Sequence, residues 1–90
     1  MTGIVVLKTK DVETLDNALN LDADLLLMQD AVYMATRGSE QNTKISQALE
    51  QETQVYVLEL DASKRGLKNR LPEAVHYLDY DGLVDLLLGG

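Results

Sequence analysis

Residues 54–60 read Gln-Val-Tyr-Val-Leu-Glu-Leu, and this stretch is the clearest strand signal in the chain. Working outward from it, short apolar runs at residues 3–8, 25–28 and 75–78 indicate three more strands. The run at 3–8 has no polar alternation, which is typical of a strand buried on both faces. The run at 25–28 is rich in Leu, so its periodicity alone fits either a strand or a helix. The regular cycle of elements around it favours a strand.

Helical patterns fill the segments between these strands. Asp11 is placed to cap a helix in which Val12, Leu15 and Leu19 recur on one face. Asp30 is the candidate cap of a second helical segment, 31–35, which ends in a break that contains Gly38. The remaining predictions are a helix around Ile45, Ala48 and Leu49 capped by Asn42 or Thr43, a short helix at 61–66, and a last helix at 80–88 capped by Asp79.

Strand and helix therefore alternate four times, with connections long enough for parallel pairing. This pattern predicts an α/β fold with three layers (α/β/α) around a small parallel sheet of about four strands. By analogy with doubly wound folds we expect the strand order 2-1-3-4. No linker is visible, so residues 1–90 are expected to form a single domain.

Composition excludes several functions. The chain has 90 residues, one Pro, no Cys and a formal net charge of −7. Without Cys it has no disulfide, no thiolate metal site and no cysteine nucleophile. The negative charge repels phosphate, which argues against a dominant role in binding nucleic acid. The apolar runs are too short to span a bilayer and the N-terminus is not basic, so we expect a cytoplasmic protein without a membrane partner.

In an open α/β sheet, ligands bind beyond the carboxyl ends of the strands, where the strand order reverses. For the order 2-1-3-4 this place lies between strands 1 and 3, and the residues there are Thr9, Lys10, Gln29, Asp30, Asp61 and Asp79. The segments after the first two strands lack the glycines that a phosphate cradle needs. The only His, His76, lies at the opposite end, and no catalytic triad or metal-ligand spacing is present. We therefore expect no catalytic residue, metal or cofactor.

Two further features each have two interpretations. Half of the basic residues are concentrated in Lys64, Arg65, Lys68 and Arg70. This cluster is either a solvated surface that offsets nearby acidic groups or a docking patch for RNA or an acidic partner. Tyr33, which follows the second strand, is either a core residue or a contact in an interface.

The segment from Leu25 to Tyr33 resembles the hallmark of the DsrE/DsrF/DsrH superfamily, in particular its DsrH/TusB branch. That branch has an apolar strand followed by Gln-Asp or Gln-Asn, a small residue and Val. Later segments agree in order and spacing: residues 55–58 with the third strand, Arg65-Gly66-Leu67 with a turn, and residues 77–86 with the last strand and helix.

This resemblance implies a role in sulfur relay. In the family, DsrE-type subunits accept persulfide sulfur on a cysteine, and DsrE, DsrF and DsrH proteins (TusD, TusC and TusB in the tRNA branch) form a heterohexamer. One branch leads to 2-thiouridine at the tRNA wobble position, and the other to dissimilatory sulfur oxidation. Since this chain has no Cys, the resemblance implies a non-catalytic subunit with DsrE/TusD-like and DsrF/TusC-like partners.

The expected contact residues lie at the junction that carries the resemblance: Gln29, Asp30, Val32 and Tyr33. Two other functions stay open. The chain could form a homo-oligomer that acts as a scaffold without a sulfur role. It could also bind or convert a small molecule with Thr9, Asp30 and Asp61.

Overall fold

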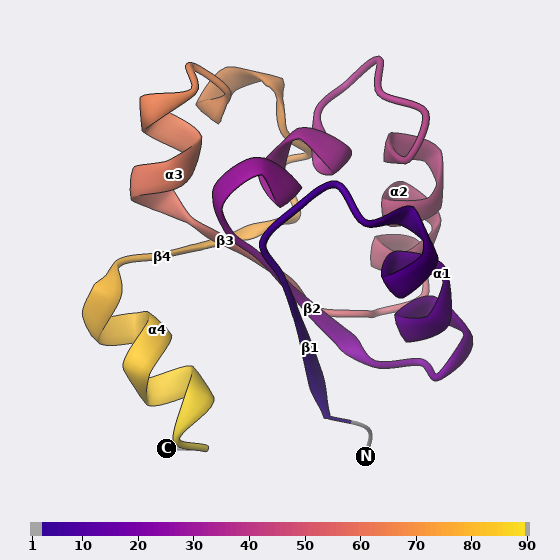
Figure 1. Ribbon diagram of the computed structural model, residues 1–90, viewed down its shortest axis with the longest axis horizontal. Coiled ribbons are helices and arrows are strands. Elements are labelled where there is room, and N and C mark those ends of the chain that lie inside the picture. The colour runs from indigo at the N-terminus through magenta and orange to yellow at the C-terminus, as the bar shows by residue number, and fades with distance from the viewer. Residues whose placement is uncertain (1–2, 90) are drawn as a thin grey trace.

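A computed structural model describes residues 3–89 (Figure 1). Ten elements follow one another: β1 (Ile4–Leu7), α1 (Val12–Asn20), β2 (Asp24–Leu27), the 3₁₀ helix η1 (Gln29–Ala35), α2 (Asn42–Glu50), β3 (Val55–Leu58), α3 (Glu59–Lys64), the 3₁₀ helix η2 (Lys68–Arg70), β4 (His76–Leu78) and α4 (Tyr80–Leu87). All four predicted strands are present.

The sheet is parallel throughout, as predicted, but its strand order is β1-β2-β3-β4. The expected order 2-1-3-4 is therefore wrong. With that order and right-handed connections, α1 would lie on the opposite face from the later crossover helices. In the structure α1 and α2 lie on the same side of β1 and β2 (Figure 1). The reason is that each new strand is added next to the previous one in the same direction. The order therefore has no reversal between β1 and β3, and β2 separates these two strands.

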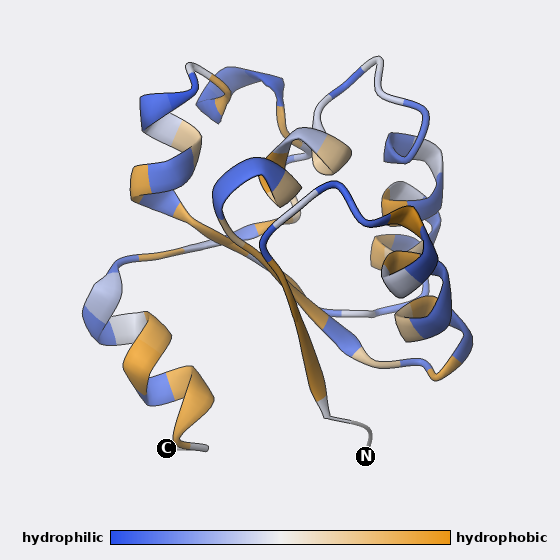
Figure 2. Ribbon diagram, in the orientation of Figure 1, coloured by the Kyte–Doolittle hydropathy of each residue, from blue (hydrophilic) through white to orange (hydrophobic). Residues whose placement is uncertain are grey.

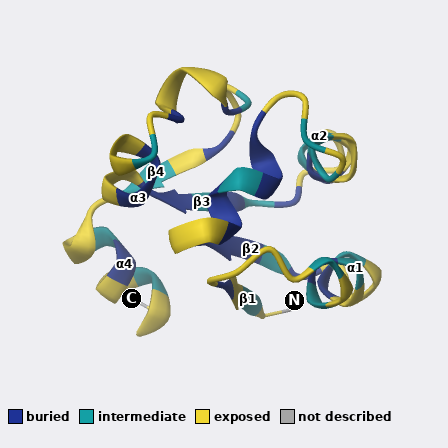
Figure 3. Cartoon of the chain, turned by 45° about the horizontal axis from the view of Figure 1, so that its top comes forward, coloured by how far each residue is buried: buried dark blue, intermediate teal, exposed yellow. Residues whose placement is uncertain are grey.

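The larger core lies between the sheet and the helices that connect its strands. β1, β2 and β3 direct alternate residues into it, and α1, η1, α2 and α3 cover them. Leu25, Leu27, Val55 and Val57 are fully buried there. Buried residues are concentrated in β2 and β3, the central strands (Figure 3). The larger core is therefore centred on β2 and β3.

The opposite face of the sheet carries a smaller core. Leu26 and Leu58 point to this side and pack with Leu83 of α4. Figure 1 shows α4 across the sheet from α1 and α2, which completes the predicted three layers. Val6 of β1 also points to this side, yet 37% of its surface is exposed. One short helix therefore leaves the β1 side of this face partly open.

Two of the predicted helix caps are confirmed. The Asp11 carboxylate accepts hydrogen bonds from the backbone N–H and the hydroxyl of Thr14, and these bonds hold the pKa of Asp11 below its ordinary value of 3.8. The Asp79 carboxylate accepts from the N–H of Gly82 at 2.7 Å. Carboxylates at helix starts offset the unpaired N–H groups there.

The other cap predictions are wrong. Asp30 lies inside η1, which begins at Gln29 without a side-chain cap. α2 begins at Asn42, whose backbone N–H donates to the hydroxyl of Ser39 at 3.1 Å. The Asn42 side chain instead donates to the carbonyl of Ala35. The turn between η1 and α2 is closed instead by Ser39, whose hydroxyl also donates to the carbonyl of Met34.

Among residues 3–89, no helix has both the length and the apolar character needed to cross a membrane.

Candidate functional site

The carboxyl ends of the strands bring several of the predicted site residues together. Because β2 lies between β1 and β3, the segment that follows β2 can contact both the segment after β1 and the segment after β3. Gln29 contacts Asp61, and Tyr33 contacts Lys10. Thr9 is exposed and Asp79 caps α4.

Gln29 leaves β2 in an unusual backbone conformation. Its φ is +49°, in the left-handed region, which costs a residue with a side chain roughly 1 kcal/mol or more. Its backbone N–H donates to Oδ2 of Asp61 at 2.7 Å. Asp61 lies in the first turn of α3 and is 8% exposed. A charge-assisted hydrogen bond to a buried carboxylate therefore holds the strained junction in place.

Arg65 links the same carboxylate to Asp30. Its Nη1 lies 3.6 Å from Oδ1 of Asp61, and its Nε and Nη2 donate to Oδ1 of Asp30 at 3.2 and 3.1 Å. We name Gln29, Asp30, Asp61 and Arg65 the Asp61 clamp, because together they fasten η1 to α3. The sequence placed Arg65 in the basic cluster and in the turn of the family resemblance, but did not pair it with Asp61. The spacing of Asp61 and Arg65 at i and i+4 in a helix was the signal that could have found this pair.

Tyr33 and Val32 have different surroundings. Val32 is fully buried in the larger core, so its side chain packs inside the domain and offers no surface to a partner. Tyr33 is half-buried against that core, and Nζ of Lys10 lies 5.2 Å from the centre of its ring. The surface part of the predicted contact set is therefore Gln29, Asp30 and Tyr33, and their role in binding stays a prediction.

The chemistry of this edge is that of a polar surface. The Asp30 and Asp61 carboxylates are both directed at Arg65. No group of three or more His, Cys, Asp or Glu side chains that could hold a metal ion occurs among the described residues. The arrangement fixes the shape of the β2–η1 junction and displays its amide and carboxylate groups. Such a surface is suited to hydrogen bonding with another protein.

The basic cluster is largely solvated and partly paired with acidic groups. Besides Arg65, Lys68 lies 3.8 Å from the carboxylate of Glu59 and 5.7 Å from the centre of the Tyr77 ring. The Tyr77 hydroxyl donates to the carbonyl of Lys68, and burial together with nearby Glu59 raises the pKa of Tyr77. These contacts fit the interpretation of a surface that offsets nearby acidic groups.

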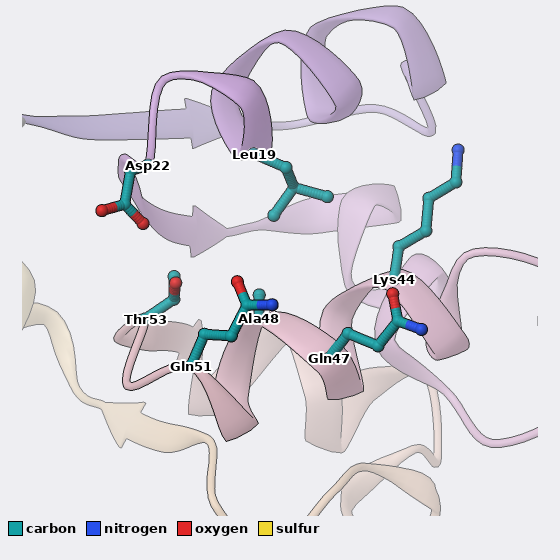
Figure 4. A pocket seen from close by; sticks show the side chains of 7 residues that line it. All are labelled: Leu19, Asp22, Lys44, Gln47, Ala48, Gln51 and Thr53. Carbon is teal, nitrogen blue, oxygen red and sulfur yellow. The ribbon is translucent and has the colours of Figure 1, made fainter.

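Two other polar features lie at the opposite end of the sheet. Nε2 of His76 lies 2.8 Å from the side-chain oxygen of Gln54, and its ring lies beside Tyr56. A pocket between the end of α1 and α2 is lined by Leu19, Asp22, Lys44, Gln47, Ala48, Gln51 and Thr53 (Figure 4). Lys44 there donates to Asp16 at 2.7 Å. Neither feature joins the residues at the carboxyl ends of the strands.

Comparisons with known proteins agree with the fold. The crystal structure of the ychN protein from E. coli superposes with a TM-score of 0.73 at 20% sequence identity, over 99% of this chain and 92% of that chain. At this identity the likeness shows the fold alone. A search among curated proteins finds no match.

A family model described as DsrH like protein matches residues 6–89. The match includes β2, the β2–η1 junction and every later described element. It therefore contains all the segments on which the sequence resemblance was based. This chain belongs to the DsrH-like family.

Proposed function

We propose that this chain is a non-catalytic subunit of a sulfur-relay assembly of the DsrEFH or TusBCD kind. The observation that carries the proposal is a DsrH-like match over residues 6–89 in a chain that contains no Cys. A persulfide relay needs a thiolate to hold the sulfur. In this proposal, DsrE/TusD-like and DsrF/TusC-like partners complete the assembly, the former supplying that thiolate, and this chain contributes contact surface.

The Asp61 clamp supports such a role. It holds the β2–η1 junction in one conformation, since the Gln29 N–H donates to Asp61 and Arg65 pairs with both Asp61 and Asp30. A contact surface that is ordered before binding loses less conformational entropy on association. Gln29, Asp30 and Tyr33 are the residues we propose for contact with a partner. The assembly would act in the cytoplasm, either towards 2-thiouridine in tRNA or in dissimilatory sulfur oxidation.

Co-expression with the DsrE-like and DsrF-like proteins of the same organism tests the assembly. We expect native mass spectrometry to show a hetero-oligomer that contains all three chains. Persulfide supplied to this assembly should be found on the DsrE-like subunit, and this chain alone should take up none. A chain that forms only a homo-oligomer would instead favour the scaffold function. Persulfide transfer or turnover by the isolated chain would contradict the proposal.

Replacing Tyr33 tests the proposed contact edge. In Tyr33→Ala we expect the affinity for the partners to fall about 30-fold, since removal of an aromatic anchor typically costs about 2 kcal/mol of binding free energy. Tyr33 also packs against the core, so urea unfolding should show some loss of stability. This loss should be smaller than the loss of binding free energy. Tyr33→Phe keeps the ring and should bind like the wild type. Unchanged affinity with a lowered melting temperature would show that Tyr33 is only a core residue.

A further inference from the structure

α4 has more apolar surface than its contact with the sheet uses. Leu83 is buried against β2 and β3, and Leu86 is partly buried beside it. The helix and its C-cap nevertheless leave four large apolar side chains at least half exposed: Tyr80 (57%), Val84 (52%), Leu87 (54%) and Leu88 (80%). Figure 2 shows the last turns of α4 as largely hydrophobic, although they lie at the outside of the fold.

Helical geometry shows in which direction these side chains point. A Cβ on Gly82 would lie 3.3 Å from Cδ2 of Leu78, so this side of α4 faces β4. The next residue, Leu83, is about 100° further around the helix and faces β2 and β3. Continuing in the same sense come Leu87, Tyr80 and Val84. The exposed apolar side of α4 therefore faces away from β4 and towards the β1 side of the sheet.

β1 contributes to the same surface. Val6 is paired in register with Leu26 and points to the α4 side of the sheet, where it is only partly covered. We name Val6, Tyr80, Val84, Leu87 and Leu88 the α4–β1 face. Val6 and α4 lie on the same side of the sheet, and exposed apolar side chains that gather on one side of a small protein commonly mark a protein–protein interface.

Charge at the border of this face indicates what kind of protein covers it. Asp81 and Asp85 are exposed on α4, which has no basic residue. Lys8, which follows β1 two residues after Val6, is exposed and basic. Two copies joined here would bring together two chains of net charge −7 and their acidic borders. Like charges across an interface oppose association, whereas opposite charges favour it.

We propose that the α4–β1 face binds a different subunit of the relay assembly, whose contact surface is apolar with Lys or Arg at its border. This inference rests on the proposed function and adds to it the surface of this chain and the chemistry of the partner. The face differs from the Asp61 clamp, which lies at the carboxyl ends of β2 and β3. The chain would therefore contact its assembly at two places.

The test compares Val84→Asp/Leu87→Asp with a matched control, Leu21→Asp. Leu21 is 66% exposed at the end of α1, so this substitution also adds an acidic group at an exposed apolar site. Each variant is co-expressed with the DsrE-like and DsrF-like proteins and its affinity measured. We expect at least a 100-fold loss for the double variant and less than a threefold change for the control. Circular dichroism and thermal melting check that each variant is folded.

Hydrogen exchange on the wild-type complex gives a second measurement that needs no substitution. We expect slower amide exchange at residues 80–88 and 3–8 in the complex than in the free chain. Two outcomes would overturn this inference and leave the proposed function standing. In the first, the wild type assembles but its amides at residues 80–88 and 3–8 exchange no more slowly than in the free chain. In the second, the wild type assembles and the folded double variant binds the partners with the same affinity. A wild-type chain that binds neither partner would overturn both. A dimer of the isolated chain that the double variant disrupts would identify a second copy as the occupant and overturn the inference.

Reversing the border charge tests the partner's chemistry. In Asp81→Lys/Asp85→Lys we expect affinity for the partners to fall about tenfold, with a weaker dependence on salt than in the wild type. Unchanged or tighter binding would contradict a partner with a basic border.

Discussion

Leu26→Ala is expected to lower the free energy of unfolding by about 3 kcal/mol, which is typical of a fully buried Leu replaced by Ala. Leu26 is 0% exposed and lies at the centre of the smaller core, between the sheet and α4. Within the described residues, the buried side chains of that core are those of Leu26, Leu58 and Leu83. Urea unfolding measures the loss.

The same substitution should loosen α4 more than the rest of the domain. The larger core does not include Leu26, so α1 and α2 keep their packing, and hydrogen exchange should accelerate first at residues 80–88. Val6→Ala is the matched control, because Val6 pairs in register with Leu26 and points to the same side but is 37% exposed. It should cost less than about 1 kcal/mol. Equal losses at the two positions would show that α4 does not cover this part of the sheet.

The strands were predictable from sequence because each is a short apolar run, whereas their order was not. Any two parallel strands form the same backbone hydrogen bonds, so neither composition nor spacing of a run identifies its neighbours. One signal was present in the sequence. β2 is buried at three consecutive positions, Leu25, Leu26 and Leu27, as expected for a strand covered on both faces and flanked on both sides. The continuous apolar run at 25–28 could thus have argued against the expected order 2-1-3-4, which places this strand at the edge, but it does not determine the whole order.

At the candidate site the sequence predicted that the segments after the second and third strands lie near each other, but it placed the site between β1 and β3, which β2 separates, and it did not predict the roles of individual residues. Asp61 and Gln29 were both expected near the carboxyl ends of the strands, and they form a hydrogen bond. The positive φ of Gln29 gave no sequence signal, since Gly or Asn is the usual residue in that conformation. Val32 was expected in a contact surface, but the tight turn of η1 directs it into the core.

The Asp61 clamp leads to the second large expected effect. Asp61→Ala removes the acceptor of the Gln29 N–H and leaves Arg65 without its buried partner. Breaking a buried ion pair from one side is strongly destabilising, and here we expect a loss of about 3 kcal/mol. Part of this loss comes from Gln29, whose left-handed conformation is no longer held by the hydrogen bond. Urea unfolding gives the value.

Two variants separate the parts of this effect. Asp61→Asn keeps an oxygen that can accept from the Gln29 N–H but removes the charge that faces Arg65, so the loss should be about 1 kcal/mol. Asp30→Ala removes the other carboxylate bound to Arg65, but the Asp30 side chain is 61% exposed, and a solvent-exposed ion pair contributes less than about 1 kcal/mol.

From the most stable to the least stable, the predicted order of the variants is Asp30→Ala, then Asp61→Asn, then Asp61→Ala. If Asp30→Ala were as damaging as Asp61→Ala, the stability of the junction would depend on the surface ion pair, and the buried hydrogen bond to Gln29 would contribute little. If Asp61→Ala instead left stability unchanged, neither contact would hold η1 against α3, and the junction could not act as a surface that is ordered before a partner binds.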